Sequence, residues 1–72
     1  FTLDQSGPVT LTVCNLLGQN VRTLIDAHRE VGVHTEAWDG RNDHGEAVPS
    51  GIYFSRLVQN DQRQVRKMVL LK

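Results

Sequence analysis

The sequence predicts a small, all-β antiparallel sandwich of about six to seven strands. Two observations support this fold class. Short segments with period-two alternation recur along the chain, and clusters rich in Gly, Asn or Asp separate them at hairpin spacing. No segment gives a confident helix, and no apolar run approaches the roughly 20 residues of a membrane span. We therefore expect a single domain over residues 1–72, near the lower size limit for a core without disulfides.

Residues 9–14 form the clearest predicted strand, because β-branched residues dominate a clean alternation. Val9, Leu11 and Val13 share one face of this strand. A shorter stub of strand precedes it at residues 1–3.

Residues 16–31 allow two interpretations. Apolar residues recur there at i, i+4, i+7 and i+8, which suits an amphipathic helix. We favour a strand over residues 21–25, because Gly18 sits badly in a helix and short strands recur on both sides. The faces of this strand are then Val21, Thr23 and Ile25 on one side and Leu24 on the other.

Three more strands are predicted, over residues 33–38, 52–58 and 63–72. The bulky Trp38 should point into the core, which places Glu36 on the same face. A buried unpaired carboxylate is costly, so Glu36 must either reach solvent at the rim or pair with a basic neighbour. The side chains expected to anchor the core are Leu11, Val13, Trp38, Tyr53 and Leu57.

The charges cancel overall, with eight basic and eight acidic residues, which argues against a nucleic-acid or membrane-surface binder. Basic residues nevertheless crowd the last predicted strand at Arg63, Arg66, Lys67 and Lys72. They either protect an exposed sheet edge from unwanted pairing or form a surface that a partner recognises. Cys14 is the only cysteine, so an internal disulfide is excluded and a small buried hydrophobic role is expected.

No constellation of residues predicts catalysis. His28, His34 and His44 lie in three separate segments without a metal-binding spacing. A triad could be drawn from Ser50, His44 and Asp43, but closeness in a loop does not position a nucleophile and its base. We therefore predict no enzymatic activity and no cofactor.

The loop after Trp38 carries four oxygen-bearing side chains, which raises the question of calcium. The candidate ligands are Asp39, Asn42, Asp43 and Glu46, and calcium takes six to eight oxygen ligands in such loops. The guanidinium of Arg41 would repel a cation, and Asp and Asn form turns by bonding nearby backbone N–H groups. Turn formation is the favoured explanation, with calcium as the alternative.

Read together, the motifs resemble a C-terminal sorting domain of the type IX (Por) secretion system. That group overlaps in sequence with the Ig-like domain of flagellar hook-capping proteins. The most specific part of the resemblance is WDGRND followed by VPSGIYF and RKMVLLK. The matching residues are 7–11, 13, 16–24, 32–34, 38–43, 45, 48–54, 56–57 and 66–72.

The resemblance implies an Ig-like sandwich whose first strand is truncated here. It also implies a non-catalytic module that directs an N-terminal passenger protein through an outer-membrane translocon and attaches it to the cell surface. A sortase-like peptidase would be a second partner, and the location would be secreted or cell-surface, reached through the periplasm of a Gram-negative bacterium. The residues expected to be recognised are Gly51, Tyr53, Arg66, Lys67 and Lys72.

Two alternative functions remain at this point. The domain could be a purely structural Ig-like unit, such as a spacer in a multidomain surface protein or a cap-like assembly domain. It could also be a self-associating surface or extracellular subunit that pairs through an open sheet edge, since unpaired strand edges add further strands readily.

Overall fold

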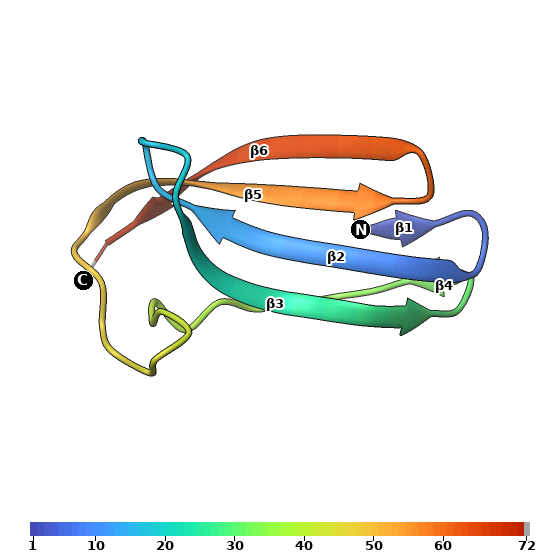
Figure 1. The fold of residues 1–72 in the computed structure, drawn as a ribbon, viewed down its shortest axis with the longest axis horizontal. Coiled ribbons are helices and arrows are strands. Elements are labelled where there is room, and N and C mark those ends of the chain that lie inside the picture. Colours follow the sequence, from blue (N-terminus) through green and yellow to red (C-terminus); the bar gives the residue numbers. More distant parts are fainter. Residues whose placement is uncertain (72) are drawn as a thin grey trace.

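The structure is a computed structural model that describes residues 1–71, and it contains six strands in two antiparallel sheets (Figure 1). The four-stranded sheet has the order β3-β2-β5-β6, and β1 pairs with β4 in a two-stranded sheet. The described part of the chain forms no helix, so it offers none that could cross a membrane. The all-β prediction is confirmed. The strands are β1 (Thr2–Leu3), β2 (Gly7–Cys14), β3 (Asn20–Arg29), β4 (Gly32–Val33), β5 (Gly51–Gln59) and β6 (Gln62–Leu70).

The region with two interpretations is a strand, as we favoured, because β3 pairs along β2 for most of its length. A tight turn joins them. In this turn the Asn15 side-chain oxygen accepts the backbone N–H groups of Leu17 and Gln19, each at 3.0 Å. Gly18 adopts a φ of +80°, which glycine reaches without strain.

A β-bulge in β3 changes which side chains face the core. Leu11 pairs with Ile25 and Thr12 with Thr23, so Leu24 is an extra residue without its own partner. Both Leu24 and Ile25 therefore pack on the same side, and Thr23 turns to the other. The predicted faces of this strand were wrong, because the extra residue interrupts the alternation.

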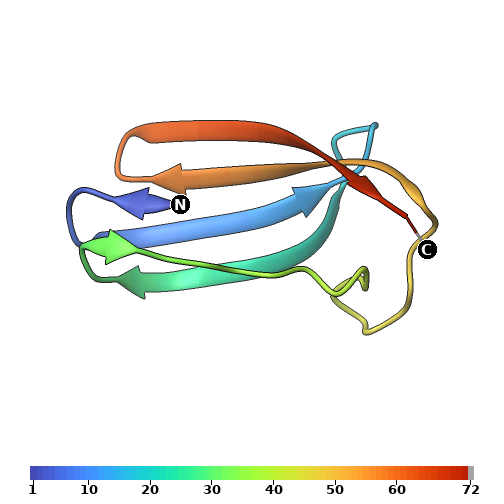
Figure 2. The same cartoon turned by 180° about the vertical axis from the view of Figure 1, so that it is seen from behind.

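The core lies on the face of the four-stranded sheet that packs against β1, which we call the inner face. Leu3, Val9, Ile25 and Leu57 form its buried cluster. Figure 2 shows β1, β4 and the chain that follows β4 crossing in front of this face, whereas nothing crosses in front of β6. The second sheet thus covers only part of the first. Of the expected anchors, Val13, Tyr53 and Leu57 are buried, while Leu11 and Trp38 are half-buried.

The predicted strand over 33–38 was wrong in extent, because only Gly32–Val33 belongs to β4. Its partner β1 is two residues long, and the backbone pairing ends where Phe1 meets His34. A strand needs a neighbour to bond with, so residues 34–38 continue without strand structure. Glu36 lies exposed on this stretch, as its solvent-reaching alternative required.

The last strand, β6, is an edge strand. It bonds to β5 on one side only, and most of its side chains are exposed. Met68 and Leu70 are half-buried on it. The predicted strand extended to Lys72, which lies outside the described residues.

Candidate functional site

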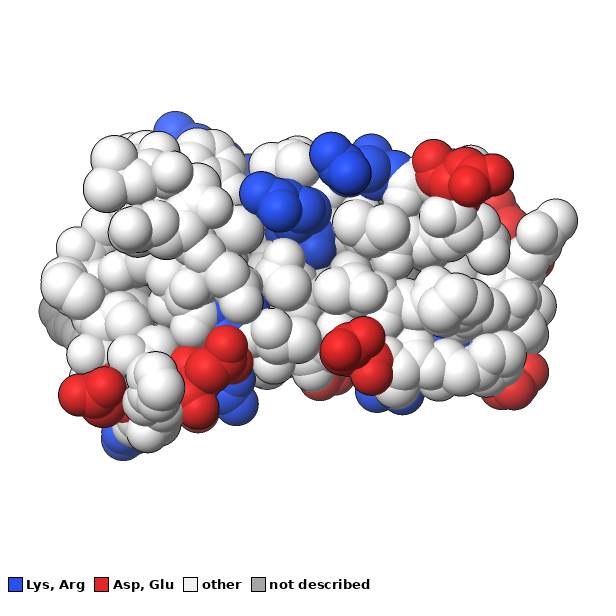
Figure 3. Space-filling view, viewed as in Figure 1, with Lys and Arg blue, Asp and Glu red and all other residues white. Residues whose placement is uncertain are grey.

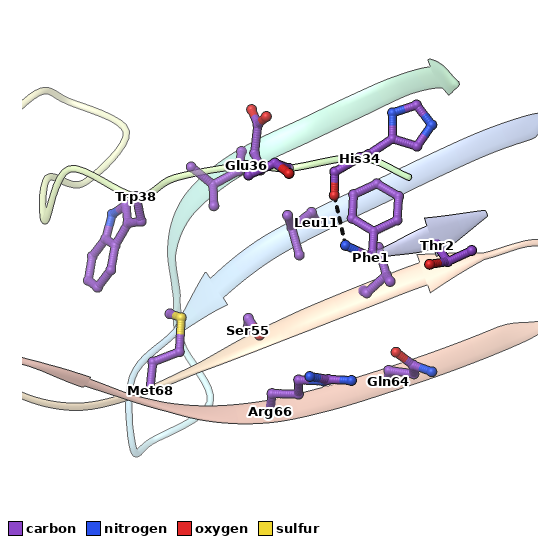
Figure 4. Close-up of a pocket in the computed structure, with 13 residues that line it drawn as sticks. Phe1, Thr2, Leu11, His34, Glu36, Trp38, Ser55, Gln64, Arg66 and Met68 are labelled. Atoms are coloured by element: carbon purple, nitrogen blue, oxygen red, sulfur yellow. Dashed lines mark hydrogen bonds between the residues drawn. The ribbon is translucent and has the colours of Figure 1, made fainter. Parts of the chain in front are cut away.

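A groove on the inner face has a volume of about 530 Å³ (Figure 4). Its floor is formed by Leu11 of β2, Leu24 of β3 and Leu57 of β5. One wall is the chain at residues 34–38, and the opposite wall is the inner face of β6. The groove therefore lies where the second sheet stops covering the first.

Strand register explains how β6 contributes to the groove. Leu57 pairs with Gln64, Ser55 with Arg66 and Tyr53 with Met68, so these side chains share the inner face. Gln64, Arg66 and Met68 line the groove, and Figure 4 shows them side by side below Ser55.

An aromatic pair closes one end of the groove. Trp38 meets Tyr53 edge to face, with ring centroids 5.0 Å apart and an angle of 67°. Each ring is also held through its polar atom: the Tyr53 hydroxyl donates to the Pro49 carbonyl at 2.7 Å, and Trp38 Nε1 donates to the Arg41 carbonyl at 2.9 Å. The end wall is thus fixed to the loop that joins residues 38 and 53.

A second aromatic pair closes the other end. The rings of Phe1 and His34 stack with centroids 5.2 Å apart. Their backbones exchange two hydrogen bonds, because the Phe1 amino group donates to the His34 carbonyl and the His34 N–H donates to the Phe1 carbonyl, each at 2.8 Å. This pair continues the ladder between β1 and β4 by one step into the groove.

Beyond that pair, the groove wall has unused backbone groups. Thr35, Glu36 and Ala37 make no hydrogen bond with any part of the chain between residues 1 and 71. Glu36 and its two neighbours are exposed, so water satisfies these groups.

Among the described Lys and Arg residues, Arg66 is the one whose side chain lines the groove. This side chain makes no hydrogen bond or ion pair with another described residue. Its neighbour Lys67 points to the opposite face of β6, where it pairs across from Phe54. Figure 3 views the opposite, outer face, where Lys and Arg atoms gather toward the edge along which β6 runs. Within the groove, the positive charge comes from Arg66.

The loop after Trp38 is fixed to β3 by charge and backbone contacts. Arg22 lies 3.6 Å from the Asp39 carboxylate and 4.0 Å from that of Asp43. Asp43 Oδ1 also accepts the backbone N–H of Thr23 at 2.9 Å. These contacts position the loop, and with it Trp38, at the end of the groove.

The predicted turn chemistry accounts for the side-chain oxygens of Asn42 and Asp39. Asn42 Oδ1 accepts the backbone N–H groups of His44 and Glu46, at 2.9 and 3.0 Å, and Asp39 Oδ1 accepts that of Arg41 at 3.1 Å. Within residues 1–71, no three His, Cys, Asp or Glu side chains are grouped as a metal site requires. Calcium binding by Asp39, Asn42, Asp43 and Glu46 stays a prediction.

Of the five residues expected to be recognised, the four that the structure describes do not gather on one surface. Tyr53 is buried, and Arg66 and Lys67 lie on opposite faces of β6. Gly51 opens β5 with a φ of +156°, a conformation that other residues rarely adopt, which indicates a backbone role. Lys72 lies outside the described residues.

Several groove residues were not singled out from the sequence, namely Leu24, Ser55, Gln64 and Met68. Because side chains alternate between the two faces of a strand, the sequence pattern could have placed Ser55 on the same face as Leu57, and Met68 on the same face as Arg66. Leu24 could not have been found this way, because the bulge that turns it inward depends on pairing with β2.

An antiparallel sheet that is covered on one face by a short second sheet, with a buried tyrosine bonded to an upstream carbonyl, is typical of a small Ig-like domain. The comparison with known families makes this class specific. The chain belongs to the FlgD Ig-like domain family, whose match covers residues 1–62.

Two curated relatives are similar to the chain. They are the basal-body rod modification proteins FlgD of Salmonella typhimurium and Salmonella typhi, each 44% identical over 45 residues. The alignment covers 62% of this chain and 19% of each relative, so the relatives are much longer than the matched part. No solved structure matches the chain significantly.

The family match corrects the function inferred from the resemblance. The flagellar half of that resemblance is confirmed, whereas a type IX sorting domain is not shown. The predicted sorting and surface attachment, the translocon and sortase-like peptidase as partners, and the secreted or cell-surface location were wrong, because the family and both relatives are flagellar. The surface or extracellular placement in the two alternatives is corrected with them, whereas a structural, cap-like assembly domain agrees with the family.

Proposed function

We propose that the chain is a non-catalytic assembly domain of a flagellar protein and that it contributes to modification of the basal-body rod. The observation that carries this proposal is the family match over residues 1–62. The rod itself enters through the printed name of the two Salmonella relatives, which are 44% identical over the aligned part. An assembly domain works by binding.

The contacts of Asp43, in the loop after Trp38, support a non-catalytic role. A hydrolytic triad would need the Asp43 carboxylate to orient His44 toward Ser50. Instead, Asp43 Oδ1 accepts the Thr23 backbone N–H and lies beside Arg22 on β3. The carboxylate therefore fixes the loop rather than a catalytic base.

A domain exchange in Salmonella typhimurium tests the proposal. The matched 45-residue segment of its rod modification protein is replaced by the corresponding residues of this chain. We expect the exchanged protein to restore swimming in soft agar to a strain that lacks the native gene. The control exchange inserts an unrelated Ig-like domain of similar length and should leave the cells non-motile. A stable exchanged protein that restores no motility would contradict the proposal.

A further inference from the structure

We propose that the outer face of the β5–β6 hairpin is the surface by which the domain holds a partner protein, and that the partner meets it with apolar side chains and carboxylates. The outer face is the side of the four-stranded sheet that faces away from β1. This inference deepens the proposed function and rests on it, because it names the contact surface of the assembly domain and the chemistry of its partner. It is carried by the apolar residues of the hairpin, by its unpaired cations and by its position opposite β1.

The hairpin carries large apolar side chains on the face where polar ones are expected. An antiparallel sheet with one face in water normally turns its apolar residues to the core and its polar residues outward. Tyr53 and Leu57 of β5 are buried on the inner face, so the residues that alternate with them point outward. Together with the outward residues of β6, the apolar members of this set form what we call the hairpin patch: Ile52, Phe54, Val58, Val65 and Val69.

The hairpin patch is exposed to solvent, whereas the neighbouring hairpin is polar along its middle. Val65 and Val69 are 57% and 59% exposed. On the adjoining β2 and β3, the outward cross-strand pairs are Thr10 with Asp26 and Thr12 with Thr23. Contact with water alone would favour polar residues on both hairpins, so it does not explain the difference. Apolar side chains gathered on one exposed surface are typical of an interaction site.

Three cations alternate with the apolar residues of the hairpin patch. In three successive cross-strand pairs, one outward side chain is a cation and the other is apolar: Phe54 with Lys67, Arg56 with Val65, and Val58 with Arg63. The side chains of these three cations make no hydrogen bond or ion pair with another described residue. Between residues 51 and 70, the single acidic residue is Asp61, in the turn. The hairpin therefore lacks the anions with which its cations would pair.

Charge selects the partner. A guanidinium bonds a carboxylate with two parallel N–H groups, so acidic side chains are the best match for the two arginines. A second copy of the chain is disfavoured, since two hairpin patches packed face to face would bring Arg56, Arg63 and Lys67 against the same cations. A longer β1 is no substitute, because Phe1 and β1 lie over the inner face and their continuation would run along that face (Figure 2). The occupant is therefore a different protein, with carboxylates around an apolar centre.

Sedimentation with isolated basal bodies tests the proposal. The probe is the basal body of Salmonella typhimurium, the structure in the printed name of the relative. The 72-residue chain, labelled with ³⁵S, is pelleted with a fixed amount of basal bodies at increasing chain concentration. We expect saturable binding that weakens at high salt, because salt screens the attraction between the cations of the hairpin and the carboxylates of the partner.

Two pairs of variants supply matched controls. Lys67→Glu reverses a charge on the outer face of β6, and Arg66→Glu makes the same change on the inner face one residue away. We expect Lys67→Glu to weaken binding about tenfold and Arg66→Glu to change it by less than about twofold. Val69→Thr should weaken binding about fivefold, because it places a hydroxyl in the apolar contact. Val33→Thr makes that substitution on β4, where Val33 is 79% exposed, and should have no such effect.

The replaced side chains are exposed, except that of Arg66, which lines the groove, so we expect each variant to keep the far-ultraviolet circular dichroism of the native chain. Equal effects of Lys67→Glu and Arg66→Glu would overturn the hairpin patch, because a general charge effect would then explain both. Equal effects of Val69→Thr and Val33→Thr would overturn it in the same way.

The remaining outcomes also decide the matter. An absence of saturable binding to basal bodies would overturn the proposal. Equal binding to phosphatidylglycerol vesicles would show that an anionic lipid surface, and not a protein, matches the patch. If the domain exchange restores motility while Lys67→Glu binds as the native chain does, the proposed function stands and the hairpin patch is wrong. If the exchange fails while binding still depends on Lys67 and Val69, the patch stands and the proposed function is wrong.

Discussion

The inner face of one sheet has two regions that differ in how they are covered. At the covered end, β1 lies over the sheet, and Leu3, Val9 and Ile25 are each no more than 3% exposed. At the groove, the wall formed by β6 keeps Arg66 exposed and Met68 half-buried, although both point to the same face. The same strands, β2, β3 and β5, run through both regions. The covering segment therefore decides burial.

Two consecutive residues of β3, Leu24 and Ile25, lie one in each region. The bulge turns Ile25 into the buried cluster and Leu24 toward the groove, so neighbours of equal volume have different surroundings. This makes them a natural pair for measuring the contrast.

The largest predicted effect comes from truncating these two side chains. Ile25→Ala removes a buried side chain and should lower the free energy of unfolding by about 2–5 kcal/mol. Leu24→Ala should cost about 1–2 kcal/mol, because that side chain is only half-buried. Equilibrium urea unfolding followed by tryptophan fluorescence measures both. If Ile25→Ala leaves no folded protein, Ile25→Val provides the comparison at an expected cost of about 1 kcal/mol. Equal losses for Leu24 and Ile25 would mean that the groove is as well covered as the core.

The sequence was sufficient for the long strands of the larger sheet, because their signal is local. Residues 9–14 and 52–58 alternate with period two, and both lie within central strands of the sheet. The strand over 33–38 failed for a non-local reason, since its length is set by the two-residue partner β1. The bulge at Leu24 likewise depends on the register against β2. Pairing partners are not visible in the pattern of a single segment.

The candidate site was predictable only in part. Arg66 was singled out as a basic residue of the last strand, and it lines the groove. That Arg66 and Lys67 point to opposite faces of the sheet follows from alternation along the strand alone. The groove itself could not be foreseen, because it exists where a covering strand stops. The function was misassigned because the resemblance on which it rested did not separate a type IX sorting domain from the flagellar Ig-like domain that the family match shows.

The next largest predicted effect concerns the end of the groove that the Trp38–Tyr53 pair closes. This aromatic pair, and not β1, covers the sheet at that end. Tyr53→Phe deletes the hydroxyl that donates to the Pro49 carbonyl and should lower the free energy of unfolding by about 0.5–1.5 kcal/mol. The edge-to-face contact with Trp38 should survive, so the near-ultraviolet circular dichroism of the tryptophan should be retained. Loss of that signal would show that the hydroxyl, and not the packed ring, holds Trp38 at the groove.

One polar group weakens the covered end. The Gln59 side-chain oxygen is buried without a hydrogen-bond partner among residues 1–71, and Gln59 pairs across from Val9. Gln59→Leu keeps a similar volume and removes the unsatisfied group, so it should raise the free energy of unfolding by about 1 kcal/mol. Urea unfolding measures the change. A decrease would indicate that the amide is bonded in solution, in which case the covered end is less apolar than its contacts suggest.

The smallest effect lies in the connection that leads into β4 and fastens the cover. The pKa of Glu30 is lowered from its ordinary value of 4.5, first by the hydrogen bond from Ser6 and then by His28. A carboxylate with a lowered folded-state pKa adds stability above its unfolded pKa and loses it as the pH falls through the folded value. The contribution should therefore be present at neutral pH and disappear progressively below 4.5, and it should be small because Glu30 is fully exposed.

Glu30→Gln removes this titration while preserving the size of the side chain. Urea midpoints of the native chain and the variant should differ slightly at neutral pH and converge in acid, because protonated Glu30 and Gln are both uncharged. Glu46→Gln is the matched control, since the Glu46 carboxylate makes no contact with another side chain in the described structure. A constant difference between native and Glu30→Gln midpoints at every pH would show that the carboxylate charge plays no part in fastening the cover. The contrast between the two regions would then rest on apolar packing around Leu3 alone.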